Sequence, residues 1–269
     1  MLAFGFLMLY PVLWMIFSSL KPNDDVMHKA AELIPSAWDF SNYGVAWREG
    51  VAGFGFWNFM KNSLVISVFS TIGTVISCVL AAYGFERIQF KGRNFWFTCM
   101  IMTMMLPAQV VIIPQYMMFQ SFGWLNTLLP LIVPAYFGAS FGAFSIFLVM
   151  QFLGGIPRDL DEAATIDGCG RYGVFLHVLL PLIKPAVATV AIFSFYWKWD
   201  DFMGPLLYLN NPKEYTVTLA LRMFTDKESN NPWGVAFAMS TLSLIPSFII
   251  FFCFQKYLVE GISTTGLKG

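Results

Sequence analysis

Long apolar runs separated by polar stretches dominate this chain. Six runs approach or exceed about 20 mostly apolar residues, the length that a helix needs to cross the hydrocarbon core of a bilayer. Backbone groups find no water in hydrocarbon, so such runs must be helical, and the alternation typical of a membrane β-barrel strand is not visible. The pattern predicts an all-α polytopic membrane protein in which residues 1–269 form one transmembrane domain. The predicted helices cover about 2–20, 60–84, 95–119, 128–150, 186–209 and 235–258.

Composition agrees with this prediction. Hydrophobic residues make up 57% of the chain and charged residues 12%, whereas soluble domains carry about 25% charged residues. The formal net charge is zero, which gives no indication of a nucleic-acid partner. The cysteines are scattered, without a CxxC pair or a Cys/His cluster, so neither a metal nor a cofactor-binding site is predicted. They are Cys78, Cys99, Cys169 and Cys253.

The polar connections indicate an orientation. Residues 85–94 form a short basic loop, and short loops carry the most weight in the positive-inside rule. In the other polar segments, Lys and Arg are nearly equal in number on the two sides of the membrane, so the prediction depends on this loop. It favours both termini in the cytoplasm, with residues 151–185 on the same side.

The long loop 151–185 carries helix signals of its own. Pro157 suits the first position of a helix, and acidic residues follow it, where the helix dipole favours negative charge. Gly168 suits the left-handed residue that ends a helix. A second helical stretch is expected from about Arg171 until Pro181 breaks it. The loop is therefore predicted to form two short helices that meet at a glycine turn outside the membrane.

One face of the first short helix is suited to contact another protein. Leu160, Ala163, Ala164 and Asp167 share a face by their spacing. The alanines leave a shallow profile that a partner's groove can approach closely, and Glu162 lies at the edge of this face, where it can meet a cation.

The spacing of this loop resembles a known family. Glu162-Ala163-Ala164, then Gly168, then Val178-Leu179-Leu180-Pro181 resembles the EAA loop of ABC-importer permeases, with Val178 a mild departure from the commoner Ile. The runs PRDLDEAATIDG, WKWDDF and QKYLVEGISTTGLKG are similar to the carbohydrate-uptake branch, and in particular to its maltose-type second permease subunit.

The resemblance implies a type I ABC-importer permease bundle of six transmembrane helices with a cytoplasmic coupling helix. The residues that it implies for coupling to an ATPase are Glu162, Ala163, Ala164, Asp167, Gly168 and Pro181. The C-terminal tail, with Gly266, Lys268 and Gly269, is implied to reach the ATPase as well.

The implied partners are a second homologous permease, two cytoplasmic ABC ATPase subunits and an extracytoplasmic solute-binding protein. Together they would form a path for a sugar across the bacterial plasma membrane, where the chain also contacts lipid.

The chain itself is not expected to be an enzyme. A P-loop needs G-x-x-x-x-G-K-[ST] between a strand and a helix, and the nearest stretch, Gly261 to Lys268, lacks this pattern. ATP and Mg²⁺ are thus expected on the partner ATPase.

The predicted fifth helix carries an aromatic and acidic run that includes Trp197, Trp199, Asp200 and Asp201. Ionisable groups at membrane depth usually face a cavity or a partner, and carboxylates beside aromatic faces suit a sugar. These residues are candidates for the substrate path. Alternatively, Lys198 and Asp201 satisfy each other. The family usually has Asn at position 200, and residues 210–232 resemble an outer loop that meets the binding protein.

Two alternatives remain open at this point. The same importer type can carry a non-sugar solute, such as a polyamine or glycerol phosphate. A secondary transporter driven by an ion gradient predicts inverted repeats and half-helices at the midplane, and it leaves the EAA-like loop unexplained.

Overall fold

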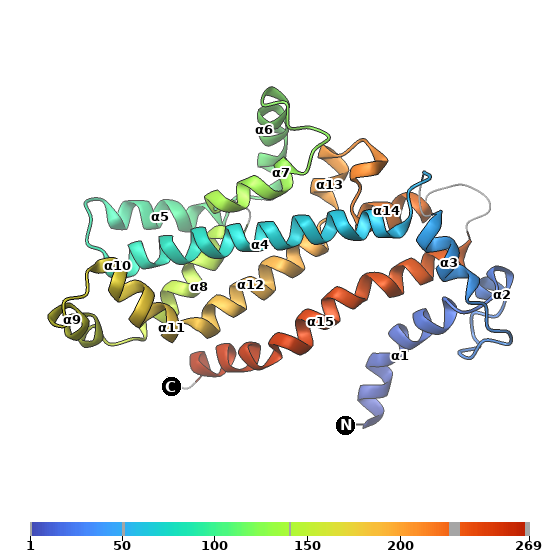
Figure 1. Cartoon of the computed structure of the whole chain (residues 1–269), viewed down its shortest axis with the longest axis horizontal. Helices are drawn as coiled ribbons and strands as arrows, with labels where there is room; N and C mark the ends of the chain where they lie inside the picture. Colours follow the sequence, from blue (N-terminus) through green and yellow to red (C-terminus); the bar gives the residue numbers. More distant parts are fainter. Residues whose placement is uncertain (1, 50–51, 140, 226–231, 267–269) are drawn as a thin grey trace. The chain divides into compact units, whose positions relative to one another are not determined.

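The computed structural model describes residues 2–49, 52–139, 141–225 and 232–266, and within these ranges it contains helices and no strand (Figure 1). The chain divides into two compact units. Unit 1 comprises Met1–Leu64 and Asp200–Ile249, and unit 2 comprises Val65–Trp199 and Ile250–Gly269. This division does not test the prediction of one permease domain over residues 1–269, which stays a prediction.

Among the described residues, three stretches are long and apolar enough to cross a membrane. They are α4 (Phe56–Arg87), the stretch Leu129–Gly154 and the stretch Trp233–Tyr257. The second stretch contains α7 (Leu129–Ile132), η1 (Val133–Phe137) and α8 (Gly142–Gly154). The third belongs to α15 (Trp233–Gly266). These helices confirm three of the predicted apolar segments, 60–84, 128–150 and 235–258.

Other predicted spans are broken or short. Helices α5 (Arg93–Thr103) and α6 (Ala108–Ser121) meet at 98°, so residues 95–119 are not one straight helix. Pro107 precedes α6, and a proline disfavours the helical conformation of the residue before it. The segment 186–209 is likewise divided, into α12 (Lys184–Trp199) and α13 (Met203–Tyr208). Helix α1 (Leu2–Ser18) matches the first predicted segment, but its described apolar stretch is shorter than a full span.

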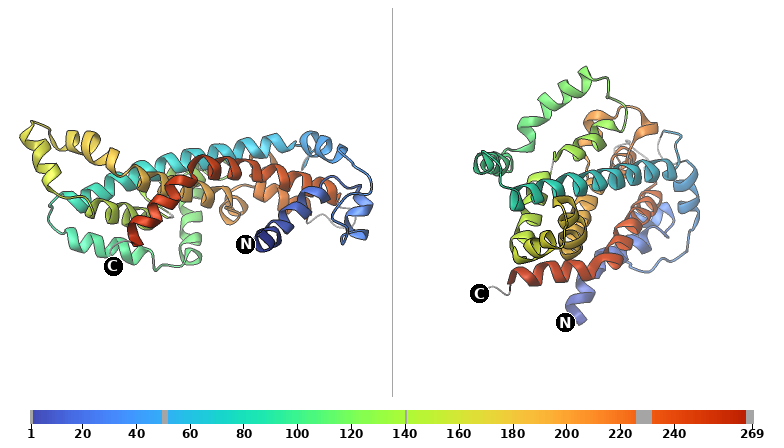
Figure 2. Two further views of the ribbon diagram at one scale, coloured as in Figure 1. Left: turned by 90° about the horizontal axis from the view of Figure 1, so that it is seen from below. Right: turned by 60° about the vertical axis from the view of Figure 1, so that its left-hand side comes forward.

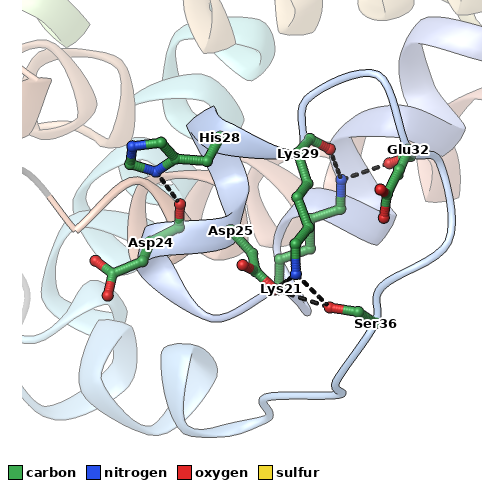
Figure 3. A network of polar contacts seen from close by, with 7 residues as sticks. All are labelled: Lys21, Asp24, Asp25, His28, Lys29, Glu32 and Ser36. Carbon is green, nitrogen blue, oxygen red and sulfur yellow. Dashed lines mark hydrogen bonds and ion pairs between the residues drawn. The ribbon is translucent and has the colours of Figure 1, made fainter.

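In unit 1, a buried lysine organises the loop after α1. Lys21 is 1% exposed, and its ammonium donates to the backbone carbonyls of Lys29 and Glu32 (Figure 3). Such acceptors are needed because a buried charge without partners is costly. Beside it, Asp25 accepts hydrogen bonds from Lys29 at 2.9 Å and from Ser36 at 2.8 Å. The polar loop is thus held in place by a closed set of contacts around α2 (Asn23–His28).

The start of α15 packs closely on the same part of unit 1. Asn42, in α3 (Ser41–Arg48), donates to the carbonyls of Ser19 and Lys21 at 3.0 and 2.9 Å. A Cβ atom at Gly234 would lie 2.5 Å from the Asn42 amide nitrogen, so only glycine allows this approach. The remaining described helices of unit 1 are η3 (Pro212–Glu214) and α14 (Val217–Thr225).

Unit 2 has its core beneath the loop 151–185. Buried residues of α4, α8 and α12 form one cluster with residues of α9 (Asp159–Ile166) and of the π-helical turn η2 (Val174–Leu179). Figures 1 and 2 show α9 at the end of unit 2 where α4 finishes and α5 begins. The loop is therefore packed on the bundle and does not stand apart from it. The buried residues are Cys78, Val79, Ala82, Ile146, Val149, Met150, Leu153, Ala164, Val174, Phe175, Leu179, Ile183, Ala186 and Val190.

Candidate functional site

The predicted coupling helix is present as α9. Its acidic residues occupy the first turn as predicted. The helix begins two residues after Pro157 rather than at it, because the Arg158 carbonyl accepts the hydrogen bonds from the amides of Asp161 and Glu162, at 2.9 and 3.1 Å. Arg158 is therefore the N-cap, and Pro157 lies outside the helix.

Gly168 ends α9 in the manner predicted for a left-handed glycine. Its φ is +87°. The Gly168 amide donates to the Thr165 carbonyl at 3.0 Å, and the Cys169 amide donates to the Ala164 carbonyl at 2.9 Å. This pair of bonds is the Schellman motif, which satisfies the last carbonyls of a helix. The turn directs the chain back toward the bundle.

The second limb of the loop is also helical. It consists of α10 (Arg171–Gly173), the π-helical turn η2 and α11 (Leu180–Leu182). The chain continues in helical form through Pro181 and bends by 75° only before α12, so the break comes later than predicted. A π-helical turn before a proline is a known way to accommodate its missing N–H group and its ring.

The exposed face of the loop differs from the expected one at Ala164. This side chain is buried in the core of unit 2, whereas Glu162, Ala163 and Asp167 are exposed. Ala164 therefore faces the chain's own bundle, because its small side chain lets α9 pack closely on the bundle.

Two large apolar side chains on the same loop are exposed, although the sequence did not single them out. Ile166 is 86% exposed and Tyr172 is 82% exposed, one on each side of the glycine turn. The available signal was the position of two apolar residues beside a polar turn. Exposed apolar groups of this size are typical of a protein-contact surface.

Arg87, at the end of α4, connects the bundle to α9. Its side chain is 5% exposed and lies 3.5 Å from the Asp161 carboxylate, which is 23% exposed. The same guanidinium donates to the carbonyls of Leu153 at 2.9 Å and Ile156 at 2.8 Å. Arg87 therefore joins the end of α4, the end of α8 and the start of α9. From the sequence, Arg87 is only one of the basic residues of the loop 85–94 that indicate the cytoplasmic side.

A second contact from α4 reaches the other limb of the loop. The Tyr83 hydroxyl donates to the Arg171 carbonyl at 3.0 Å, and its ring lies 4.8 Å from that of Phe175. Both limbs of the hairpin are thus attached to one long helix.

The candidate substrate-path residues lie in different surroundings. Trp197 stacks against Phe141 and Phe193, and Trp199 is buried and stacks on Phe195. These tryptophans belong to unit 2.

The two acids of the same run belong to unit 1. The Asp201 carboxylate accepts from the Gly204 amide at 3.0 Å, which helps to begin α13 after residues 200–202. A path shared by Trp197, Trp199, Asp200 and Asp201 stays a prediction, and so does the alternative pairing of Lys198 with Asp201.

Part of the predicted ATPase contact falls beyond the described chain. Gly266 is the last residue of α15, and Lys268 and Gly269 lie outside the described residues. Within the predicted outer loop 210–232, residues 226–231 also lie outside them.

The apolar helices and the exposed, anchored hairpin define a subunit of a membrane transport system. Residues 73–264 match the family model described as "Binding-protein-dependent transport system inner membrane component". The chain belongs to this family, the permeases of ABC importers, and is an inner-membrane component.

Relatives and solved structures agree with this assignment. The chain is 35% identical to "Probable ABC transporter permease protein YurM" of Bacillus subtilis, over 97% of this chain and 84% of that protein. It is 31% identical to "Trehalose/maltose transport system permease protein MalG" of Thermococcus litoralis, over 97% and 92%. A chain from a crystal structure of a bacterial ABC transporter involved in the import of alginate has a TM-score of 0.81, with 23% identity and coverage of 95% and 92%. The last likeness shows the type I permease fold.

Proposed function

We propose that this chain is the permease subunit of an ATP-driven importer for a sugar or oligosaccharide, and that α9 couples it to an ATPase. The observation that carries this proposal is the hairpin 159–182, which presents Glu162, Ala163, Ile166 and Tyr172 outward. Arg87 pairs with the Asp161 carboxylate and Tyr83 donates to the Arg171 carbonyl, so α4 holds both limbs of the hairpin.

The proposed mechanism is mechanical. A groove on the ATPase receives α9, with Ala163 allowing close approach and Glu162 meeting a cation on the partner. Ile166 and Tyr172 supply apolar contact area at the glycine turn. Closure of the ATPase displaces α9, and the contacts of Ala164 and Arg87 transmit that displacement to α4 and α8.

The complex proposed around this chain contains a second homologous permease, two ABC ATPase subunits that hold ATP and Mg²⁺, and an extracytoplasmic solute-binding protein. Both termini and the hairpin lie on the cytoplasmic side in this proposal. Gly168 and Pro181 shape the hairpin, and the tail with Gly266, Lys268 and Gly269 makes a second ATPase contact.

A sugar is the proposed cargo for two reasons. The relative from Thermococcus litoralis carries trehalose/maltose transport in its name. The sequence of this chain also places tryptophans beside carboxylates at 197–201, and aromatic faces and acceptors are the two kinds of group that a sugar ring uses.

The experiment is ATP hydrolysis by the complex in nanodiscs, with the binding protein and a panel of saccharides, polyamines and glycerol phosphate. We expect one saccharide to stimulate hydrolysis. Glu162→Lys reverses the charge on the outward face and is expected to abolish the stimulation while the complex stays in the membrane. The matched control is Asp159→Lys, which reverses an exposed acid at the start of the same helix.

Each outcome decides a separate part of the proposal. Stimulation by a non-sugar solute alone would retain the importer and remove the carbohydrate assignment. Normal coupling in Glu162→Lys would remove the role given to that residue. If an active ATPase and a loaded binding protein give no stimulation with any solute, the proposed coupling of this chain to the ATPase would be contradicted.

A further inference from the structure

A cavity of about 490 Å³ lies in unit 2 beside the coupling hairpin. It is formed where α4 ends, α5 begins and α8 ends. Its polar lining comes from Glu86, Arg93, Asn94 and Gln151, and its apolar lining includes Phe97 and Met150. The volume falls in the range of small-molecule sites, and nothing in the proposed transport mechanism uses it.

The charges in this cavity form an incomplete pair. The Arg93 guanidinium lies 3.9 Å from the Glu86 carboxylate, beyond hydrogen-bond distance. Both side chains are partly exposed, at 27% and 21%. A ligand that carries an anion and a hydrogen-bond donor a few ångströms apart would therefore meet both groups at once. Asn94 and Gln151 add amide groups that can donate to the same anion.

Neighbouring aromatic residues indicate the depth of the cavity in the membrane. Phe95 and Trp96, in the first turn of α5, are 65% and 58% exposed. Exposed Trp beside an apolar helix is typical of the membrane–water interface. The mouth of the cavity thus lies where lipid headgroups are.

We propose that this cavity binds the headgroup of a glycerophospholipid. The phosphodiester contacts Arg93 and the amides of Asn94 and Gln151, and an N–H or O–H donor of the headgroup contacts Glu86. The apolar lining, with Phe97 and Met150, receives the start of an acyl chain. Ethanolamine and glycerol headgroups both carry such a donor, whereas the quaternary ammonium of choline carries none.

The bound lipid would also support the coupling hairpin, a consequence that rests on the proposed function. Glu86 is adjacent to Arg87, which contacts Asp161, and Arg158 donates to the Glu86 carbonyl at 3.3 Å. Filling the cavity therefore steadies the turn of α4 from which α9 is held.

The test is lipid retention by the full chain purified in detergent, measured by native mass spectrometry with added phosphatidylethanolamine, phosphatidylglycerol or phosphatidylcholine. We expect the first two to bind about tenfold more tightly than the third, the equivalent of one hydrogen bond to a charged group. Arg93→Gln should weaken all three, and Glu86→Gln should reduce the preference, because a neutral amide oxygen accepts a weaker hydrogen bond than a carboxylate. Lys91→Gln, in the same loop but outside the lining, should change neither.

Thermal unfolding of each variant shows whether it is folded. Equal binding of phosphatidylcholine, or unchanged binding in a folded Arg93→Gln variant, would overturn the proposal. Displacement of the lipid by inorganic phosphate alone would show that the site takes a free anion, which also overturns it. Because retention is measured without transport, its failure would leave the proposed function untouched.

Discussion

At the scale of single residues, Gly168 is the position where backbone conformation decides the geometry of the candidate site. Its left-handed φ could be expected from the sequence, because a glycine after a short acidic helix is the usual terminator. Arg87 and Ala164 could not be placed in this way. Their roles depend on which elements pack together, and neither the end of an apolar run nor an alanine pair specifies its neighbours.

Gly168 can be tested without changing its packing. A Cβ atom there would meet no atom within 4 Å, so a substitution changes the backbone energy alone. Gly168→Val is expected to destabilise the turn by about 1–2 kcal/mol and to lower solute-stimulated ATP hydrolysis. Gly168→Asn is the control, since Asn tolerates the left-handed region. Hydrogen exchange over residues 159–182 provides the structural measurement, and equal protection in both variants would contradict the prediction.

The Asp25 contacts predict that the stability of the fold depends on pH in the acid range. Hydrogen bonds from Lys29, and then from Ser36, hold the pKa of the Asp25 carboxyl below its ordinary value of 3.8. A lowered pKa in the folded state stabilises the fold above the unfolded pKa, and this contribution is lost as the pH falls through the folded value. The effect is expected to be small because the group is solvent-screened.

The measurement is thermal unfolding in detergent as the pH is lowered through the range of carboxyl titration. At neutral pH, the Asp25→Asn variant is expected to unfold at a lower temperature than the unmodified chain. At acid pH, the two unfolding temperatures are expected to coincide. Asp24→Asn replaces the neighbouring exposed acid, whose backbone carbonyl, not its carboxylate, contacts His28. A similar loss in both variants would show that general charge, not the Asp25 contacts, is responsible.

At the scale of elements, the apolar pattern located the helices better than it located their breaks. Helices α4 and α15 follow from continuous apolar sequence, and each extends beyond the predicted segment because helix can continue past the hydrocarbon. The bend between α5 and α6 lies at Pro107, a visible signal, but prolines also occur inside continuous helices. Pro11 and Pro246 do so here, so the residue type alone does not predict where a helix is interrupted.

The connection between α4 and α9 carries a prediction at this scale. Removing one partner of a buried ion pair costs about 3–5 kcal/mol when a charge is left buried. Arg87→Ala also removes two hydrogen bonds to backbone carbonyls, whereas Asp161→Ala leaves Arg87 with both of them. We therefore expect Arg87→Ala to reduce stability and coupling more than Asp161→Ala.

A double-mutant cycle isolates the pair. With thermal unfolding and solute-stimulated ATP hydrolysis as readouts, the double variant should resemble Arg87→Ala, with a coupling energy between the two sites of about 0.5–3 kcal/mol. Arg87→Lys retains the charge but loses the planar guanidinium that reaches two carbonyls. Its stability and coupling should lie between those of the unmodified chain and those of Arg87→Ala. Additive losses would show that the two residues act independently.

At the scale of the whole molecule, the class of protein followed from the sequence, and the family model and relatives confirm it. Apolar length predicted the membrane bundle, and the gapped spacing from Glu162 to Pro181 predicted the importer family. The substrate path could not be resolved in the same way. Its candidate residues, 197–201, are divided between the two units along the sequence, and a path depends on surfaces supplied by other elements and other chains.

Lys21 and Arg87 both hold main-chain atoms, and this has a consequence for how the sequence can vary. Lys21 holds the carbonyls of residues 29 and 32, and Arg87 holds those of 153 and 156. Every residue type supplies a carbonyl, so these contacts do not themselves specify a side chain at the four positions. Glu32 is exposed, whereas Leu153 and Ile156 also pack in the core of unit 2. A deep mutational scan should therefore show intolerance at positions 21 and 87 and broad tolerance at 32. At that position a long side chain from elsewhere holds the backbone while the local side chain remains free to diverge.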